Sequence, residues 1–442
     1  MGYMPIPRLL YSMALPMMIS MLVQAMYNIV DSIFVARISE QALTSVSLAF
    51  PMQNLMIGVG TGIGIGTNAL LSRKLGERDL ETADRSAMQG VFLSICAYIL
   101  FAILGLTVTG AFFRGQTQVP EIIHGGIRYL TIICLCSFGL FGQMITERLL
   151  QSTGLTFYSM ITQMTGAIIN IILDPIMIFG LFGFPRMGIA GAAAATVFGQ
   201  FSATVLAVWF NLTRNREIHF RWKNIRPDPV MIRQILLIGV PSLIMVAIGS
   251  IMTFFMNRIL GVFSSTAVAV FGVYFRMQSF IMMPVFGLNG GMIPIIAYNY
   301  GARKKERILQ TIRLSVITAM GVMLAGMMLL QLFPGKMLLL FDASENMLSI
   351  GIPAFRTISL SFIMAGYCIV ASSVFQAFGR SVLGMIMSLV RQLFVLLPAA
   401  WLLSRTGDVN LVWWAWPLAE LAAVLISTLF LRKINREIID HL

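Results

Sequence analysis

The chain has 442 residues, of which 58% are hydrophobic and only 11% are charged. A soluble domain carries about 25% charged residues, so this composition excludes an ordinary globular enzyme. It predicts an all-α polytopic membrane protein, because helices satisfy their own backbone in lipid and a β-barrel would show short alternating segments. The formal charge of +13 comes from basic residues between apolar runs, which predicts membrane lipids as partners and no nucleic acid.

Apolar runs separated by charged or Gly/Pro-containing segments predict twelve transmembrane helices in two six-helix lobes. The first six are expected near residues 8–36, 46–72, 88–113, 122–150, 156–181 and 187–213. The other six are expected near residues 231–260, 268–298, 308–333, 348–378, 381–404 and 411–431. The most polar connection follows the sixth span. We therefore expect an N-lobe at 1–213, a cytoplasmic linker at 214–230 and a C-lobe at 231–442.

The first span carries polar residues on one helical face. Gln24, Asn28 and Asp31 are spaced so that they share that face. A charged residue within a span costs about 2.5–3.5 kcal/mol on insertion scales, which makes Asp31 a functional candidate. Its alternative role is that of a buried polar group that only fixes helix packing.

The fourth and fifth spans add further polar groups. Glu147 and Arg148 are expected near the cytoplasmic end of the fourth span, at the membrane interface. Asn170 and Asp174 are one helical turn apart in the fifth span. With Asp31, these two residues can hold a hard cation through oxygen ligands, or the two carboxyl groups can share a proton. The alternative role of Asp174, which precedes a proline, is to end a helix.

The second half contains a different set of charges. Glu420 lies in the last span, and Arg276, Arg356 and Arg391 lie in the eighth, tenth and eleventh spans. We expect an ion-pair network in the C-lobe, in which one of the three arginines neutralises Glu420.

The two halves are a sequence repeat at an offset of 225 positions. The repeated pairs include Pro16/Pro241, Gly62/Gly287, Arg78/Arg303 and Gly154/Gly379. Six spans per half predict parallel repeats related by a pseudo-two-fold axis along the membrane normal, an architecture typical of secondary transporters. The acids are not repeated, because Asp31 falls opposite Met256 and Asp174 opposite Ala399. The predicted coupling site therefore belongs to the first half.

Charge distribution and missing motifs limit the remaining possibilities. Most Lys and Arg residues outside the spans fall on the side that holds both ends of the chain, which predicts cytoplasmic termini. The three histidines lie at span ends or in loops, and the sequence has no G-x-x-x-x-G-K-[ST] motif. We expect no enzyme, no ATP-driven pump and no cofactor other than a coupling ion.

Several segments resemble the multidrug and toxic compound extrusion (MATE) family, over essentially the whole chain. They are Pro16, Asp31, Phe275-Arg276-Met277-Gln278, Gly287 and Asn299-Tyr300-Gly301-Ala302. The resemblance implies two lobes around a central cavity and a secondary active exporter. Such a protein antiports cationic or amphipathic organic compounds against H⁺ or Na⁺ by alternating access.

The DinF-like branch of that family implies roles for single residues. Its cation site pairs a first-span Asp with an Asn-x-x-x-Asp pair, which Asp31, Asn170 and Asp174 match, and adds a sixth-span Thr, best matched by Thr196. Na⁺, if it is the coupling ion, would bind at these four residues. The supporting polar network would be Gln24, Asn28 and Tyr129. Pro16 matches the proline at which the first helix bends.

Some alternatives stay open at this stage. The NorM-like branch carries acids in the seventh and tenth spans, and residues 231–260 and 348–378 have none, so coupling through the C-lobe is not expected. A flippase of lipid-linked oligosaccharides would share the fold and use Arg276, Arg356 and Arg391 to line a cationic cavity. We expect a monomer in the plasma (inner) membrane of a bacterium or archaeon, and the choice between H⁺ and Na⁺ is open.

Overall fold

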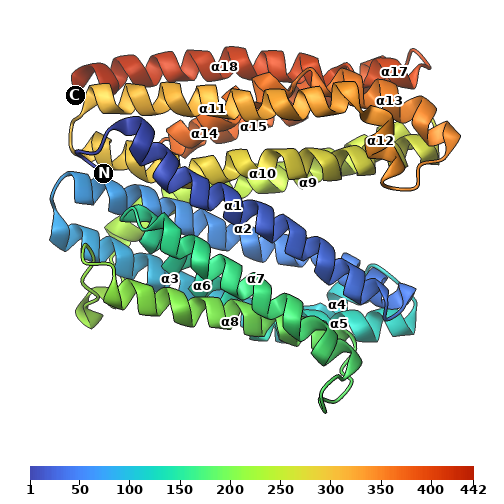
Figure 1. Ribbon diagram of the computed structural model, residues 1–442, viewed down its shortest axis with the longest axis horizontal. Coiled ribbons are helices and arrows are strands. Elements are labelled where there is room, and N and C mark those ends of the chain that lie inside the picture. The colour runs from blue at the N-terminus through green and yellow to red at the C-terminus, as the bar shows by residue number, and fades with distance from the viewer. The chain divides into compact units, whose positions relative to one another are not determined.

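The structure is a computed structural model that describes residues 1–442, with every side chain except that of Trp222. Every regular element that it describes is a helix (Figure 1). Ten segments are each long and apolar enough to cross a membrane. They are α1 (Ile6–Ala36), α2 (Glu40–Gly76), α3 (Leu80–Thr107), α7 (Thr156–Phe179), α8 (Ile189–Thr213), α9 (Pro229–Gly261), α10 (Ser265–Gly301), α11 (Lys305–Leu332), Ser381–Ser404 and Val409–His441.

Two further spans are bent pairs of helices. They are α5 (Pro120–Leu135) with α6 (Phe138–Ser152), bent by 44°, and α13 (Glu345–Ser359) with α14 (Phe362–Ala377), bent by 50°. Counting each pair as one span gives twelve, which confirms the predicted fold class. The apolar runs predicted unbroken spans at 122–150 and 348–378. Serine hydroxyls stabilise the breaks, because Ser137 and Ser361 donate to the carbonyl oxygens of Cys134 (2.8 Å) and Ile358 (2.6 Å).

The remaining helices are short. They are α4 (Thr109–Arg114), η1 (Trp222–Ile225), α12 (Pro334–Leu339), α15 (Ser381–Leu389), η2 (Val390–Leu396), α16 (Leu397–Ser404), α17 (Val409–Val412), α18 (Ala415–Glu437) and η3 (Ile439–His441). The segment η2 is a π-helix that interrupts the eleventh span between α15 and α16. A π-turn within a span often marks a functional position.

The chain folds into two compact units. The N-unit is Ile19–Val240, and the C-unit is Met1–Met18 together with Pro241–Leu442. Both boundaries fall inside long helices, α1 and α9, rather than in the linker that separates the predicted lobes 1–213 and 231–442. The first part of each lobe's opening helix therefore packs within the other unit.

Glycines make this exchange of helix segments sterically feasible. In the N-unit, a Cβ on Gly62 of α2 would lie 2.6 Å from the carbonyl oxygen of Gly239 in α9. In the C-unit, a Cβ on Gly287 of α10 would lie 2.5 Å from Cα of Met18 in α1. Both distances are well below an ordinary contact of about 3.5–4.0 Å, so only glycine fits at these two repeat-related positions.

The repeat is also visible in the backbone at helix ends. Ser39 and Ser264 each cap the following helix by accepting a hydrogen bond from a backbone N–H, at 3.0 and 3.1 Å. Arg78 and Arg303 follow the ends of α2 and α10 and have positive φ angles of 61° and 54°. The same offset thus relates side-chain caps and unusual backbone conformations in the two units.

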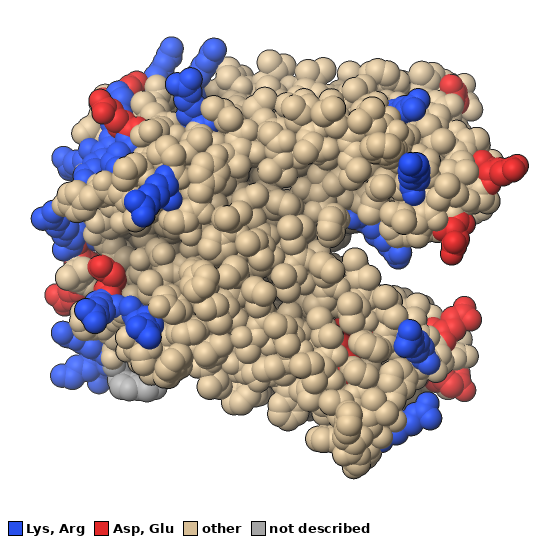
Figure 2. Space-filling view, in the orientation of Figure 1, with Lys and Arg blue, Asp and Glu red and all other residues tan. Residues whose placement is uncertain are grey.

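Each unit has its own apolar core. Phe101, Phe113 and Phe141 are fully buried in the N-unit, and Tyr274 and Trp413 are fully buried in the C-unit. Charged side chains gather toward the ends of the helices in each unit, and broad surfaces with few charged side chains lie between them (Figure 2). This distribution is what a lipid-embedded helix bundle requires.

Candidate functional site

Asp174 lies within α7 and is fully buried, at 0% exposure. The helix continues through Pro175 to Phe179, and Gly180 ends it with a φ of 73°. The proposed helix-ending role of the Asp-Pro step is therefore wrong. Pro175 instead removes one backbone N–H from the helix interior, directly beside the buried carboxyl group.

Asn170, at 2% exposure, connects Asp174 to α8. Its amide is oriented so that both polar atoms have partners. The nitrogen donates to Asp174 Oδ2 at 3.2 Å, and the oxygen accepts from Thr196 Oγ1 at 3.2 Å and from the Thr196 backbone N–H at 3.0 Å. The structure thus brings together three of the four residues of the predicted cation site.

Small residues allow α7 and α8 to approach closely enough for this contact. A Cβ on Gly199 of α8 would lie 2.6 Å from the carbonyl oxygen of Gly166 in α7, and 3.2 Å from Cβ of Asn170. Glycine pairs of this kind are a common device for packing helices in membranes. They place the Asn170 amide against Thr196.

Asp31 of α1 supplies the fourth residue and the second carboxyl group. It is half-buried, and its carboxyl group lies within hydrogen-bonding reach of the Asp174 carboxyl group. One oxygen of each, Oδ1, is buried without a donor among the described groups. Two carboxylates in contact repel each other unless a proton or a cation lies between them. The arrangement therefore suits a shared proton or a bound monovalent cation.

Two tyrosines lie close to the acidic pair. Tyr129 of α5 is 3% exposed, and its hydroxyl accepts a hydrogen bond of 3.1 Å from Gln53 Nε2 of α2. Tyr129 and Tyr27 both lie within electrostatic reach of Asp31 and Asp174. Tyr27 and Gln53 are absent from the predicted site, although Tyr27 lies one helical turn before Asp31 and could have been found by that spacing.

A second buried carboxyl group lies in the same unit, contrary to the expected interfacial position of Glu147. Glu147 of α6 is 4% exposed. It accepts hydrogen bonds from Gln143 Nε2 (2.9 Å), Thr162 Oγ1 (3.1 Å) and Gln163 Nε2 (2.7 Å). Ser20 of α1 donates to Gln163 Oε1 and extends the network to a third helix. The sequence offered no signal for these partners beyond the polarity of each residue.

Both halves of the sequence repeat match the model of a known protein family. Residues 16–176 and 241–402 match the family model described as MatE, and the two matched segments begin at the repeated prolines. The chain belongs to the MatE family. The resemblance stated from the sequence is thereby confirmed, while assignment to the DinF-like branch stays a prediction.

Relatives of this MatE chain align along nearly its full length. Multidrug export protein MepA of Staphylococcus haemolyticus (strain JCSC1435) is 25% identical over 430 residues, which cover 97% of this chain and 94% of that protein. A solved structure described as the outward-facing conformation of a multidrug resistance MATE family transporter has a TM-score of 0.90 at 25% identity and covers 96% of this chain and 95% of its own. A solved structure of a MOP superfamily transporter from Pyrococcus furiosus Vc1 has a TM-score of 0.89 at 25% identity and covers 96% of this chain and 95% of its own. Its description says that the reverse polarity of its binding pocket suggests a different function.

The remaining predicted residues of this MatE protein lie apart from the acidic pair. Gln24 and Asn28 are exposed on α1, and no hydrogen bond among the described groups joins their side chains to Asp31 or Asp174. Pro16 is half-buried in the part of α1 that packs in the C-unit. Their predicted supporting and bending roles stay predictions.

In the C-unit, the structure pairs only two of the four predicted charged residues. Arg391 Nη1 lies 3.0 Å from Glu420 Oε1, and Glu420 is 8% exposed. Arg391 lies on the π-helical segment η2. Arg276 and Arg356 are exposed and form no ion pair with a described carboxyl group. Glu420 is thus neutralised by one specific arginine.

The acidic site offers the oxygens of two carboxyl groups and one hydroxyl group, while the Asn170 amide turns its nitrogen toward Asp174. Among the described residues, no group of three His, Cys, Asp or Glu side chains gathers in a form that could hold a metal ion. Asp31 and Asp174 instead combine with the amide of Asn170 and the hydroxyl of Thr196. Oxygen donors of this kind suit a hard monovalent ion, and two carboxyl groups suit a proton equally well.

Proposed function

We propose that this chain is a secondary active multidrug exporter, which antiports cationic or amphipathic organic compounds against H⁺ or Na⁺ by alternating access. The observation that carries the proposal is the pair of carboxyl groups inside the N-unit, Asp174 at 0% exposure and half-buried Asp31, which lie within hydrogen-bonding reach of each other. A buried ionisable pair in a membrane span is costly and is retained where it serves transport. The name of the relative from Staphylococcus haemolyticus, a multidrug export protein, supports the class of substrate.

Competition for one negatively charged site explains how such a pair couples two fluxes. A proton or Na⁺ between Asp31 and Asp174 removes their repulsion, and its loss leaves a negative site that attracts an organic cation. A ligand shifts a conformational equilibrium only by its different affinity for the two states. Because Asp31 lies on α1 and Asp174 on α7, occupation of the site changes the force between these two helices.

The remaining expectations concern the setting of the transporter. We propose that it works as a monomer in the plasma membrane of a prokaryote, with both termini in the cytoplasm. The positive-inside bias of the sequence supports this orientation. Bacterial relatives support the type of membrane.

The alternative function, a flippase of lipid-linked oligosaccharides, receives less support. It needs several unpaired arginines in the C-unit to attract a diphosphate. Arg391 is neutralised by Glu420 at 3.0 Å, which removes one of the three candidates. We therefore retain the multidrug exporter as the proposed function.

Drug transport by the reconstituted protein tests the proposal. We expect transport under an imposed H⁺ or Na⁺ gradient for the wild type and loss of transport for Asp31→Asn. The matched control is Asp440→Asn, because Asp440 is a carboxylate with 43% side-chain exposure in a surface ion pair with Lys305. Unchanged gradient-driven transport by folded Asp31→Asn would contradict the scheme.

A further inference from the structure

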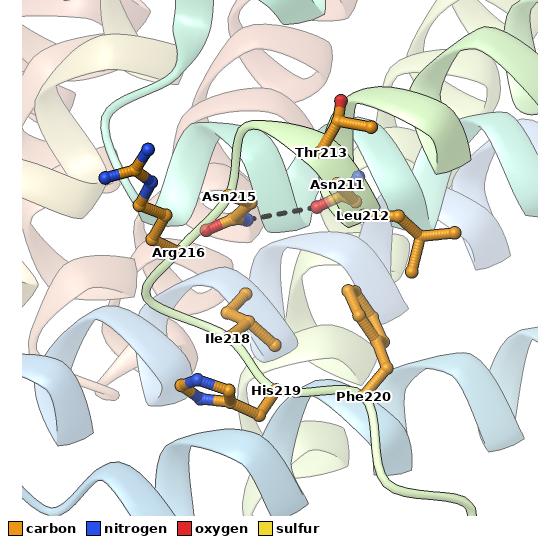
Figure 3. A pocket seen from close by; sticks show the side chains of 8 residues that line it. All are labelled: Asn211, Leu212, Thr213, Asn215, Arg216, Ile218, His219 and Phe220. Atoms are coloured by element: carbon orange, nitrogen blue, oxygen red, sulfur yellow. Dashed lines mark hydrogen bonds between the residues drawn. The ribbon is translucent and has the colours of Figure 1, made fainter.

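The N-unit contains a second candidate for a binding site. Asp31, Asn170, Asp174 and Thr196 are not part of it. A pocket of about 560 Å³ lies where α8 ends and the linker begins (Figure 3). Its walls are the last residues of α8 and the linker residues up to Phe220. Because α8 is long and apolar enough to cross a membrane, we expect its C-terminal end, and with it this pocket, at the level of the lipid headgroups.

Buried amides form one wall of the pocket. Asn211 and Asn215 are 2% and 5% exposed, and Asn215 Nδ2 donates to Asn211 Oδ1 at 3.1 Å. Asn211 Nδ2 is held in turn by the carbonyl oxygens of Thr146 and Ala207, both at 2.9 Å. Asn215 Oδ1 is buried and has no donor among the described groups. In Figure 3 this oxygen points away from Asn211. A buried acceptor without a donor is costly, and a ligand O–H or N–H would remove that cost.

The linker wall is fixed in place. The backbone N–H of His219 donates to Asp84 Oδ1 at 2.8 Å, and Asp84 is 5% exposed. Further along the linker, Gln89 Nε2 donates to the carbonyl oxygens of Asn224 (2.9 Å) and Arg226 (2.7 Å). These bonds fasten the linker to α3 at two places. The pocket is therefore preformed and does not depend on a ligand to order it.

The pocket offers one unpaired basic group. Arg216 lines it, is exposed and forms no ion pair with a described carboxyl group. His219 lines it too, but its Nδ1 already lies 3.8 Å from Asp84 Oδ2. The neighbouring Arg214 and Arg221 are exposed and keep the region basic. Among the described residues that line the pocket, Arg216 is thus the basic group without a carboxylate partner, and its guanidinium group suits a phosphate.

An exposed apolar stripe of α8 leads to the pocket. Val205, Val208, Trp209 and Leu212 are 53%, 39%, 52% and 66% exposed. Their spacing places them on one face of the helix, and Leu212 also lines the pocket. A ligand that occupies both features must have an anionic head and an apolar tail.

We propose that this pocket binds the headgroup of an anionic glycerophospholipid whose headgroup also carries hydroxyl groups, as in phosphatidylglycerol. Arg216 binds the phosphate, and Asn215 Oδ1 accepts a hydrogen bond from a headgroup hydroxyl. The acyl chains lie along the Val205–Leu212 face of α8. A soluble glycerol phosphate shares the head chemistry but lacks the tails, so the test must separate the two sources.

Native mass spectrometry of the full chain in detergent tests the site. Phosphatidylglycerol, phosphatidylcholine and free glycerol phosphate are added separately at equal concentrations. We expect selective retention of phosphatidylglycerol, and binding about fivefold weaker in Arg216→Gln, the loss that one basic residue near an anionic headgroup accounts for. The matched control, Arg214→Gln, removes the same charge from an exposed position that does not line the pocket and should weaken binding clearly less than Arg216→Gln.

A second variant tests the acyl-chain part of the site. Leu212→Gln should weaken phosphatidylglycerol binding while the protein keeps the wild-type melting temperature, because Leu212 is exposed. Equal losses in Arg216→Gln and Arg214→Gln would overturn the proposal in favour of diffuse charge. Equal retention of phosphatidylcholine, or glycerol phosphate retained as well as the lipid, would overturn it as an anionic-lipid site.

Discussion

Asn170 donates a hydrogen bond of 3.2 Å to Asp174 Oδ2 from one helical turn earlier on the same helix. This bond occupies one oxygen of the carboxyl group and leaves Oδ1, which has no donor among the described groups, free to act. Asn170 also accepts from Thr196 and so fixes its own orientation. The amide therefore presents the acid at a set position, as a supporting partner does in a metal site.

Removing this amide should weaken coupling without unfolding the protein. Asn170→Ala deletes a hydrogen bond that stabilises the ionised Asp174 carboxylate, a bond worth about 1.5–3 kcal/mol. We therefore expect Na⁺ to bind at least tenfold more weakly, because Na⁺ needs the ionised carboxylate, and H⁺ to bind at least tenfold more tightly. The dependence of drug transport on H⁺ and Na⁺ concentration measures both changes. Asn410→Ala is the control, because Asn410 is exposed in α17, at the start of the Val409–His441 segment. Equal ion dependence in both variants would contradict the role of Asn170.

The two carboxyl groups should behave as one unit. Asp31→Asn and Asp174→Asn are each expected to abolish coupled transport, and the double variant should be no worse than either single one. Groups that act together show such non-additivity. Transport rates of the four proteins at one imposed gradient give the comparison. Strictly additive losses would mean that the two acids act independently.

Glu147 should stabilise the N-unit through the three hydrogen bonds that its carboxyl group accepts. Glu147→Gln turns an NH₂ group toward Thr162 or Gln163 and leaves at least one donor unpaired, at a cost of about 1–3 kcal/mol. We expect a lower melting temperature in detergent. The control is Glu437→Gln, whose side chain is 52% exposed and should leave the melting temperature unchanged. A melting temperature equal to the wild type would show that the network is not stabilising.

The ion pair of the C-unit allows a test by double substitution. Arg391→Met leaves Glu420 buried without its partner, which should cost about 3–5 kcal/mol. Replacing both residues, Arg391→Met with Glu420→Leu, should restore most of the lost stability, because the buried charge is then absent. Thermal unfolding of the wild type and these two variants measures the change. A double variant as unstable as Arg391→Met would contradict the pairing.

The close helix approach in the N-unit predicts a strong dependence on one glycine. Gly62→Ala places a Cβ 2.6 Å from a backbone oxygen that cannot move aside, and should destabilise the protein by about 1–3 kcal/mol. Gly321 of α11 is the control, because a Cβ there meets nothing within 4 Å. Gly321→Ala should be neutral or slightly stabilising. Melting temperatures that change equally would contradict the proposed contact.

The sequence alone determined the features that depend on length, composition and local chemistry. Twelve spans follow from apolar runs long enough to cross a bilayer. The offset of the repeat aligns Arg78 with Arg303, and both residues follow the end of a helix. Asp31 and Asp174 stand out because a carboxyl group within a span is costly wherever the helix packs.

Only the tertiary structure decided which side chains meet. Nothing local distinguishes Arg391 from Arg276 as the partner of Glu420, because the choice depends on how their helices are rotated and spaced. The burial of Glu147 arises in the same way, from donors on α6 and α7 that packing brings together. The unit boundaries inside α1 and α9 also depend on packing, since glycines far apart in sequence create the space into which each helix fits.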